Sequence, residues 1–177
     1  MHPRLIAITG YLADVRADLA AELSRCTPVQ LHQEPGHGHW TVAQVVEHLG
    51  RVEGSTAKLL EGLFARALED GLAEDPDTSS LLGALDRWNV TSRRSRIEAP
   101  ERLVPAPHPD FDAAWSALKK VRQRTLAAVA TVDGRDLTRV SFKHPVLDHF
   151  NGYEWILFIG QHEARHLDQI REVLHGR

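Results

Sequence analysis

The sequence predicts an all-α protein, a four-helix bundle with long crossover connections. Three observations support this fold class. Four long segments carry apolar residues at steps of three and four, the spacing that places them on one face of an α-helix. No segment shows the sustained two-residue alternation that is typical of a half-buried strand. Residues 71–109 separate the second and third helices, so simple up-down-up-down connectivity is not required.

The first predicted helix runs from about Arg4 to Arg25, and Thr27-Pro28 ends it. Its apolar positions form one stripe, made of Leu5, Ile8, Leu12, Val15, Leu19 and Leu23. A polar loop rich in histidine and glycine is expected from Gln30 to His39.

The second predicted helix begins after Thr41, with Gln44 placed three residues later to complete a capping box. It continues to about Asp70, and Gly71 is positioned to close it. Prolines and aspartates then mark residues 71–109 as mostly loop, with a short helix expected at Ser80–Asn89.

Asp110 is expected to cap a third helix from Phe111 to about Val132. A connector follows, with a short extended piece expected at Thr138–Phe142. Asn151 is expected to cap the fourth helix, which runs to about Leu174. The length of 177 residues fits one domain with its own core, so residues 1–177 are predicted to be a single domain.

The composition narrows the possible partners. Net charge is −3 and the isoelectric point is near 6.4, which disfavours a nucleic-acid or membrane-surface binder. A single cysteine, Cys26, excludes an internal disulfide and favours a reducing compartment, and we expect it to act as a lone small hydrophobe. The expected location is therefore the cytoplasm.

The fourth helix carries His162-Glu163-Ala164-Arg165-His166. Its two imidazoles are four residues apart and therefore project from one helix face, a spacing that suits two ligands of one divalent metal ion. They stand in the middle of a stripe made of Trp155, Ile159, His162, His166, Gln169 and Val173. The alternative is a pair of histidines that are separately hydrogen-bonded. His48, which interrupts the apolar stripe of the second helix, is the third candidate ligand.

The same five residues match the His-Glu-x-x-His motif of zinc peptidases. In one peptidase pattern a glycine stands three residues, and a histidine six residues, after the second histidine. Here Gln169 and Glu172 occupy those positions, and the chain ends too soon for another helix, so we reject the peptidase interpretation. The rival metal donors are His37 and His39 of the loop.

Other polar residues near the pair have more than one interpretation. Glu163 could act as a general base or bond a ligand histidine, but it lies about 100° around the helix from His162, which favours a salt bridge. Gln169 could bond a ligand imidazole. Arg165 is expected to face a partner helix or solvent.

Three sequence blocks carry a resemblance to a known family. The first is Trp40-Thr41-x-x-Gln44-Val45-x-x-His48-Leu49, and the second is His144-Pro145. The third is Tyr153-Glu154-Trp155-x-x-Phe158-Ile159-x-x-His162-Glu163-x-Arg165-His166-x-x-Gln169-Ile170. In this order they resemble the DinB/YfiT-like superfamily of metalloenzymes over nearly the whole chain. The resemblance implies a four-helix bundle, a homodimer, and a zinc or nickel site at His48, His162 and His166.

Members of that superfamily with assigned activity include thiol-S-transferases that use bacillithiol or mycothiol, thiol-dependent isomerases, and domains that help to activate a thiol. The favoured function is therefore metal-dependent transfer of a low-molecular-weight thiol to a small electrophile. A divalent ion on neutral imidazoles keeps its charge and lowers the pKa of a bound thiol or water. The alternatives are a metal-dependent hydrolase and a non-catalytic, metal-stabilised module for binding or stress response.

Overall fold

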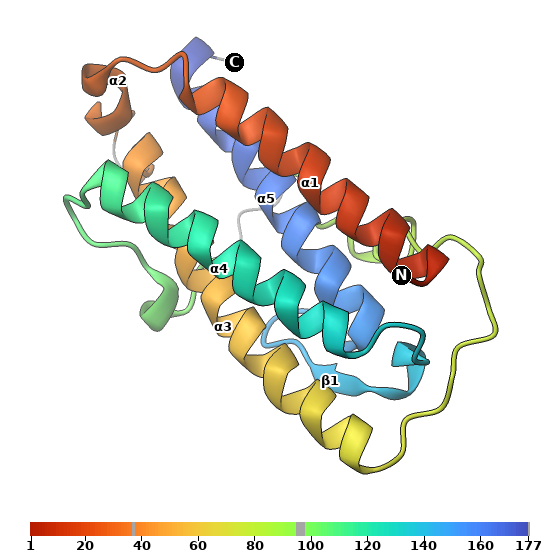
Figure 1. The fold of residues 1–177 in the computed structure, drawn as a ribbon. Coiled ribbons are helices and arrows are strands. Elements are labelled where there is room, and N and C mark those ends of the chain that lie inside the picture. The colour runs from red at the N-terminus through yellow and green to blue at the C-terminus, as the bar shows by residue number, and fades with distance from the viewer. Residues whose placement is uncertain (37, 95–97, 177) are drawn as a thin grey trace.

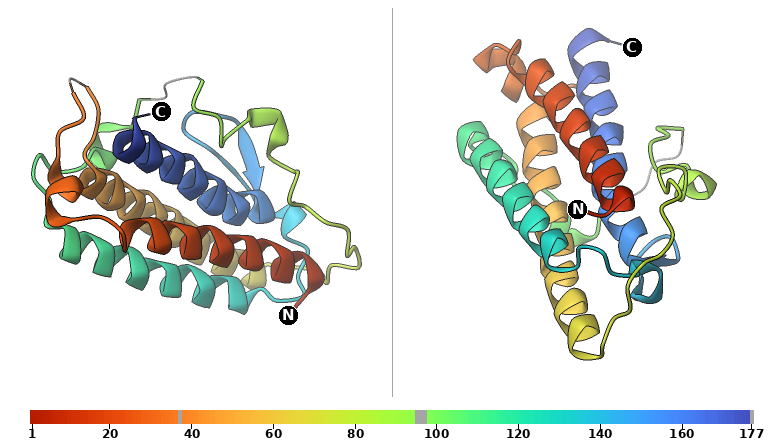
Figure 2. Two further views of the ribbon diagram at one scale, coloured as in Figure 1. Left: turned by 90° about the horizontal axis from the view of Figure 1, so that it is seen from above. Right: turned by 45° about the vertical axis from the view of Figure 1, so that its right-hand side comes forward.

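The computed structural model describes residues 1–36, 38–94 and 98–176 and is built from four long helices (Figure 1). They are α1 (Pro3–Leu23), α3 (Val42–Glu69), α4 (Phe111–Thr131) and α5 (Gly152–His175). Helix α3 packs along α4 and α5, and α1 packs along α5, so that the four surround a common interior (Figure 2). The predicted all-α four-helix bundle is confirmed. None of the described helices is long and apolar enough to cross a membrane.

Helices α1 and α5 run in the same direction. Arg16 of α1 pairs with Glu163 of α5, and further along both helices Glu22 pairs with Arg171. Helices α3 and α4 also run parallel to each other, from the same end of the bundle and opposite to α1 and α5 (Figure 1). The bundle is therefore up-down-down-up.

The connection between α3 and α4 explains this topology. Near its start it lies beside the N-terminus of α1, where the Arg4 guanidinium donates to the Asp75 carboxylate at 3.0 Å. Near its end it lies beside the N-terminus of α3, where the Gln44 amide donates to the Pro107 carbonyl at 3.0 Å. Since these two points are at opposite ends of the bundle, the connection carries the chain back along its full length (Figure 1).

The helix caps agree with the sequence predictions. Thr41 and Asn151 each form a complete capping box with the residue three positions on, and the Asp110 side chain accepts the Ala113 N–H at 2.8 Å. Gly71 follows α3 with a φ of +82°, a left-handed conformation that favours glycine.

Two expected loop and helix assignments were wrong. Helix α2 (Pro28–His32) occupies part of the stretch from Gln30 to His39 that was expected to be loop. Its signal was a second capping box, formed by Thr27 and Gln30, but five residues are too short to show helical periodicity. The helix expected at Ser80–Asn89 shrinks to one 3₁₀ turn, η1 (Asp86–Trp88).

A small hairpin precedes α5. Strands β1 (Ser141–Lys143) and β2 (His149–Asn151) pair in antiparallel register, with Phe142 opposite Phe150. The extended piece expected at Thr138–Phe142 therefore begins later in the chain, at Ser141, because Thr138 and Arg139 belong to a 3₁₀ turn, η3 (Leu137–Arg139). A further 3₁₀ turn, η2 (Glu101–Leu103), lies in the crossover connection.

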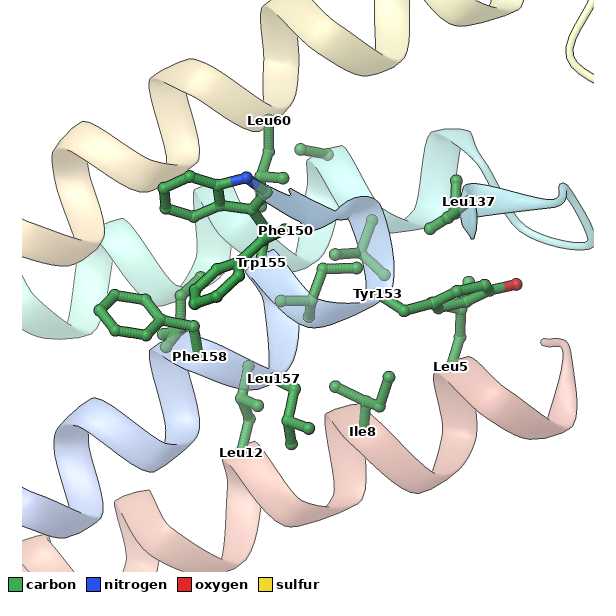
Figure 3. Close-up of a cluster of buried hydrophobic side chains, with 14 of the residues drawn as sticks. Leu5, Ile8, Leu12, Leu60, Leu137, Phe150, Tyr153, Trp155, Leu157 and Phe158 are labelled. Atoms are coloured by element: carbon green, nitrogen blue, oxygen red, sulfur yellow. The ribbon is translucent and has the colours of Figure 1, made fainter. Parts of the chain in front are cut away.

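The apolar interior consists of two clusters. One surrounds the N-terminal half of α5 and includes Leu5, Ile8, Leu12, Leu60, Phe150, Tyr153, Trp155 and Leu157 (Figure 3). The other surrounds its C-terminal half and includes Leu19, Leu23, Val42, Val45, Leu49, Leu118, Leu167 and Ile170. Each such side chain contributes about 1.5–3 kcal/mol when fully buried, so these clusters stabilise the bundle at both ends.

A buried charged layer lies between the two clusters, with one side chain from each long helix. Arg122 of α4 donates to Glu53 of α3 at 2.6 Å and to Glu163 of α5 at 2.5 Å. Arg16 of α1 donates to Glu163 at 2.6 Å and to Glu53 at 3.1 Å. Two arginines and two glutamates balance in charge, as burial of ions requires.

We predict that Arg122→Met destabilises the protein by about 3–5 kcal/mol, because it leaves buried carboxylates short of a cation. Arg124→Met is the matched control, since Arg124 is on the same helix and pairs with Glu61 at the surface. Urea unfolding should show a large fall in midpoint for the first variant and almost none for the second. Equal midpoints for the two variants would refute the structural role of the charged layer.

Candidate metal centre

The three histidines predicted from the sequence lie together. His162 and His166 are one turn apart on α5, and His48 approaches them from α3, with one ligand atom from each within 4.8 Å of the others. The ring centroid of His48 lies 5.3 Å from that of His162 and 4.8 Å from that of His166. Within the described ranges, this is the cluster of potential ligand side chains whose atoms lie close enough together that it could hold a metal ion.

Hydrogen bonds set the tautomers of two rings. His48 Nδ1 lies 2.8 Å from the Leu103 carbonyl in η2, and His166 Nδ1 lies 2.7 Å from Gln169 Oε1. A carbonyl oxygen only accepts, so Nδ1–H donates in both cases. Each Nε2 therefore carries a lone pair, the form in which imidazole binds a metal. Gln169 has the contact that would orient a ligand ring.

The spacing of the nitrogens fits a shared ion. His162 Nε2 and His166 Nε2 are 3.2 Å apart. Two imidazole nitrogens on a tetrahedral zinc, each at about 2.0–2.1 Å, would be separated by about 3.3–3.4 Å. Three imidazoles also leave one position of such an ion open, as in catalytic zinc sites.

Burial keeps these rings neutral. It lowers the pKa of His48, lowers that of His166 to about 3, and holds the pKa of His162 well below its usual value. Neighbouring histidines add to the pKa shifts of His162 and His166. At neutral pH all three rings are therefore uncharged and compatible with a cation.

The histidines open onto a cavity of about 720 Å³, within the range of about 300–1,000 Å³ typical of small-molecule sites. Much of its wall is apolar, formed by Trp40, Val52, Leu59, Trp88, Trp155 and Phe158. Its basic side chains are Arg93, Arg102, Lys143 and Arg165, whereas the acidic side chain on the wall is the exposed Glu98. The cavity can therefore take a molecule that is partly apolar and partly anionic.

Arg165 lies in a different place from the one expected. It was expected to face a partner helix or solvent, but it is buried and lines the cavity. Burial and the nearby Arg93 lower its pKa. The signal was its position three residues after His162, which places both on neighbouring parts of one helix face.

His144 is a second cavity residue that sequence reasoning missed as a site residue. It was noted only within the His144-Pro145 block. It reaches the cavity from the turn of the β1–β2 hairpin, a position that helical periodicity could not reveal.

Glu163 lies outside the cavity. Its carboxylate is fully buried and held by Arg16 and Arg122, so the structure shows the interhelical ion pair and gives the general-base interpretation no support. Of the rival loop donors, His37 lies outside the described residues. His39 is exposed on the cavity wall and does not belong to the three-histidine group.

The fold and the histidine group define a four-helix bundle with a candidate metal centre, and comparisons with known proteins agree. The family model of the DinB superfamily matches residues 11–170. The uncharacterized protein YuaE of Bacillus subtilis is 30% identical over 164 residues, which cover 90% of this chain and 93% of YuaE. The chain therefore belongs to the DinB superfamily, a metal-binding family.

Two further proteins resemble this chain, but the resemblance to each supports less about it than the family match does. The crystal structure of TT2238, described as a four-helix bundle protein, has a TM-score of 0.62 at 23% identity and covers 93% of this chain and 96% of that chain. It supports the fold alone. A Lon protease of Nitratidesulfovibrio vulgaris is 30% identical over 142 residues, which cover 77% of this chain but only 16% of the protease.

We predict that replacing His48, His162 or His166 with Ala weakens zinc binding by at least about 100-fold, since changes to residues that merely support ligands already cost 10- to 100-fold. His149→Ala is the matched control because His149 is exposed and outside the cavity. Competition with a chelating dye measures the affinities. Tight binding by His48→Ala together with loss in His39→Ala would assign the metal to the loop histidines.

We predict that acid destabilises the metal-free protein through these rings. Their pKa values are lowered in the folded state, so protons bind mainly to the unfolded chain once the pH falls below about 6.5. Stability should then decrease by up to about 1.4 kcal/mol per pH unit for each ring. Urea midpoints at pH 7.5 and 5.5 test this. His166→Phe should show a weaker pH dependence, and an unchanged dependence would contradict the explanation.

Proposed function

We propose that the protein is a metal-dependent enzyme that transfers a low-molecular-weight thiol to a small electrophile, with zinc or nickel held by His48, His162 and His166. The observation that carries the proposal is the opening of a neutral three-imidazole group onto a cavity of about 720 Å³. Family membership adds support, because the resemblance implies thiol chemistry for related proteins.

The residues of the chain have distinct tasks in this proposal. When bound, the divalent ion would lower the pKa of a thiol and favour the reactive thiolate. Leu103 and Gln169 hold two of the imidazoles in the tautomer that presents Nε2. Trp40 forms an apolar wall beside the group, with its ring 4.7 Å from that of His48 and 6.4 Å from that of His166.

The basic side chains of the cavity support binding of an anionic thiol. Arg165 is on α5, three residues after His162. Arg93 is in the crossover connection and pairs with Glu172 of α5 at 2.6 Å. Lys143 is exposed at the hairpin. Carboxylates, which are common on cellular thiols, would be attracted to these cations, and arginine binds them with paired hydrogen bonds.

A hydrolase is the weaker candidate. Metal-assisted hydrolysis gains from a general base beside the attacking water. Among the described residues that line the cavity, the carboxylate belongs to the exposed Glu98, while Glu163 is held in the charged layer. A thiol that is already deprotonated needs no such base. A non-catalytic role remains the second alternative. That the chain forms a homodimer also stays a prediction, which the particle mass from light scattering would test.

We predict that zinc- or nickel-loaded protein accelerates conjugation of monochlorobimane with at least one of cysteine, glutathione, bacillithiol and mycothiol. Fluorescence of the conjugate measures the rate. Removal of the metal and His162→Ala should each abolish the acceleration, because the thiolate would no longer be stabilised. His149→Ala should retain it.

Two outcomes would contradict the proposed function. Ester hydrolysis that depends on the metal, without thiol transfer, would favour the hydrolase. A metal that raises the thermal midpoint but supports neither reaction would favour the non-catalytic module.

A further inference from the structure

His144 has a fixed hydrogen-bonding arrangement inside the cavity. It begins the turn of the β1–β2 hairpin, where its own N–H donates to the Asp148 carbonyl at 2.7 Å. Its ring accepts at Nδ1 from the backbone N–H groups of Val146 and Leu147, at 3.3 and 3.2 Å. Pro145 has no N–H, so these are the first two donors that the turn can offer.

Two donors at Nδ1 determine where the ring proton lies. An N–H at Nδ1 would face both backbone N–H groups and break both hydrogen bonds. The proton of the neutral ring is therefore on Nε2. A second proton is disfavoured for the same reason, and burial lowers the pKa of His144 to about 4. The ring is thus a neutral hydrogen-bond donor at physiological pH.

The surroundings of the ring are aromatic. Its centroid lies 5.0 Å from that of Phe150, 5.2 Å from Trp155 and 4.7 Å from Phe158. Figure 3 shows these three aromatic side chains gathered together. Phe158 also contacts His162, with centroids 5.4 Å apart, which connects the His144 wall to the metal ligands.

The Nε2 atom is available to a ligand. Among the described residues no protein group hydrogen-bonds to it. It is also absent from the fully buried side-chain atoms that lack a partner, so part of its surface is exposed. His144 lines the cavity, so Nε2 is accessible from there. The neutral Nε2–H lies among aromatic rings and offers no positive charge of its own, so at this donor an uncharged acceptor is favoured over a carboxylate, whose lost hydration the ring alone would not offset.

We propose that His144 is a substrate-binding residue whose neutral Nε2–H donates a hydrogen bond to a carbonyl oxygen of the electrophilic substrate. The proposal deepens and rests on the proposed function, because it takes the cavity as the substrate site. It assigns the two ends of the cavity different tasks. At the candidate metal centre His48 and His166 present lone pairs, whereas His144 presents a proton. The substrate class is a small aromatic or apolar molecule with a carbonyl group.

The test compares two unreactive probes on the zinc-loaded protein. Acetophenone and ethylbenzene share a phenyl ring and a two-carbon chain, and the carbonyl is the difference between them. Their dissociation constants are measured by NMR titration. The ratio of the ethylbenzene constant to the acetophenone constant should fall about 3- to 10-fold in His144→Phe, the effect of one net hydrogen bond. It should not change in His149→Phe, an exposed position of the same hairpin.

A measurement on the unmodified protein keeps the test valid if the variant fails to fold. The imidazole nitrogen spectrum of His144 should show the proton on Nε2, and that proton should shift with acetophenone but not with ethylbenzene. A proton on Nδ1, no shift with acetophenone, or an unchanged ratio in folded His144→Phe would each overturn the proposal.

This test is independent of thiol transfer. A carbonyl preference that depends on His144, in a protein without transferase activity, would support the inference and refute the proposed function. Transferase activity without that preference would refute the inference alone.

Discussion

The ion pairs of Glu163 fix how α5 is rotated about its own axis within the bundle. Arg16 from α1 and Arg122 from α4 hold its carboxylate on the side of α5 that faces these two helices, away from the cavity. His162 precedes Glu163 by about 100° around the helix axis and therefore faces α3 and the cavity. A rotation of α5 would separate buried charges, which is costly, and would also move the ligand rings. The charged layer is thus coupled to the metal centre although it does not touch the cavity.

The sequence predicted what local patterns encode. The caps at Thr41, Asp110 and Asn151 and the apolar stripes placed the four helices, because both signals act within a few residues. The convergence of His48 with His162 was predictable because each interrupted a stripe that had to face the interior.

The remainder depends on contacts between distant segments. Helix α2 was missed because it is short. The position of Arg165 follows from the packing of the crossover connection near α5, and that of His144 from a hairpin whose register only the fold determines. Glu163 was predicted to favour a salt bridge, but its two arginine partners lie 147 and 41 residues away in the chain, beyond the reach of spacing arguments.

The central claim is that one divalent ion is held by three imidazoles from two helices. X-ray absorption at the zinc edge, on protein loaded with one equivalent of zinc, tests it most directly. The account predicts three imidazole nitrogens at about 2.0–2.1 Å, with the multiple-scattering signature of histidine, and at least one further light-atom ligand. A spectrum with sulfur at about 2.3 Å, or with fewer than three imidazoles, would contradict it.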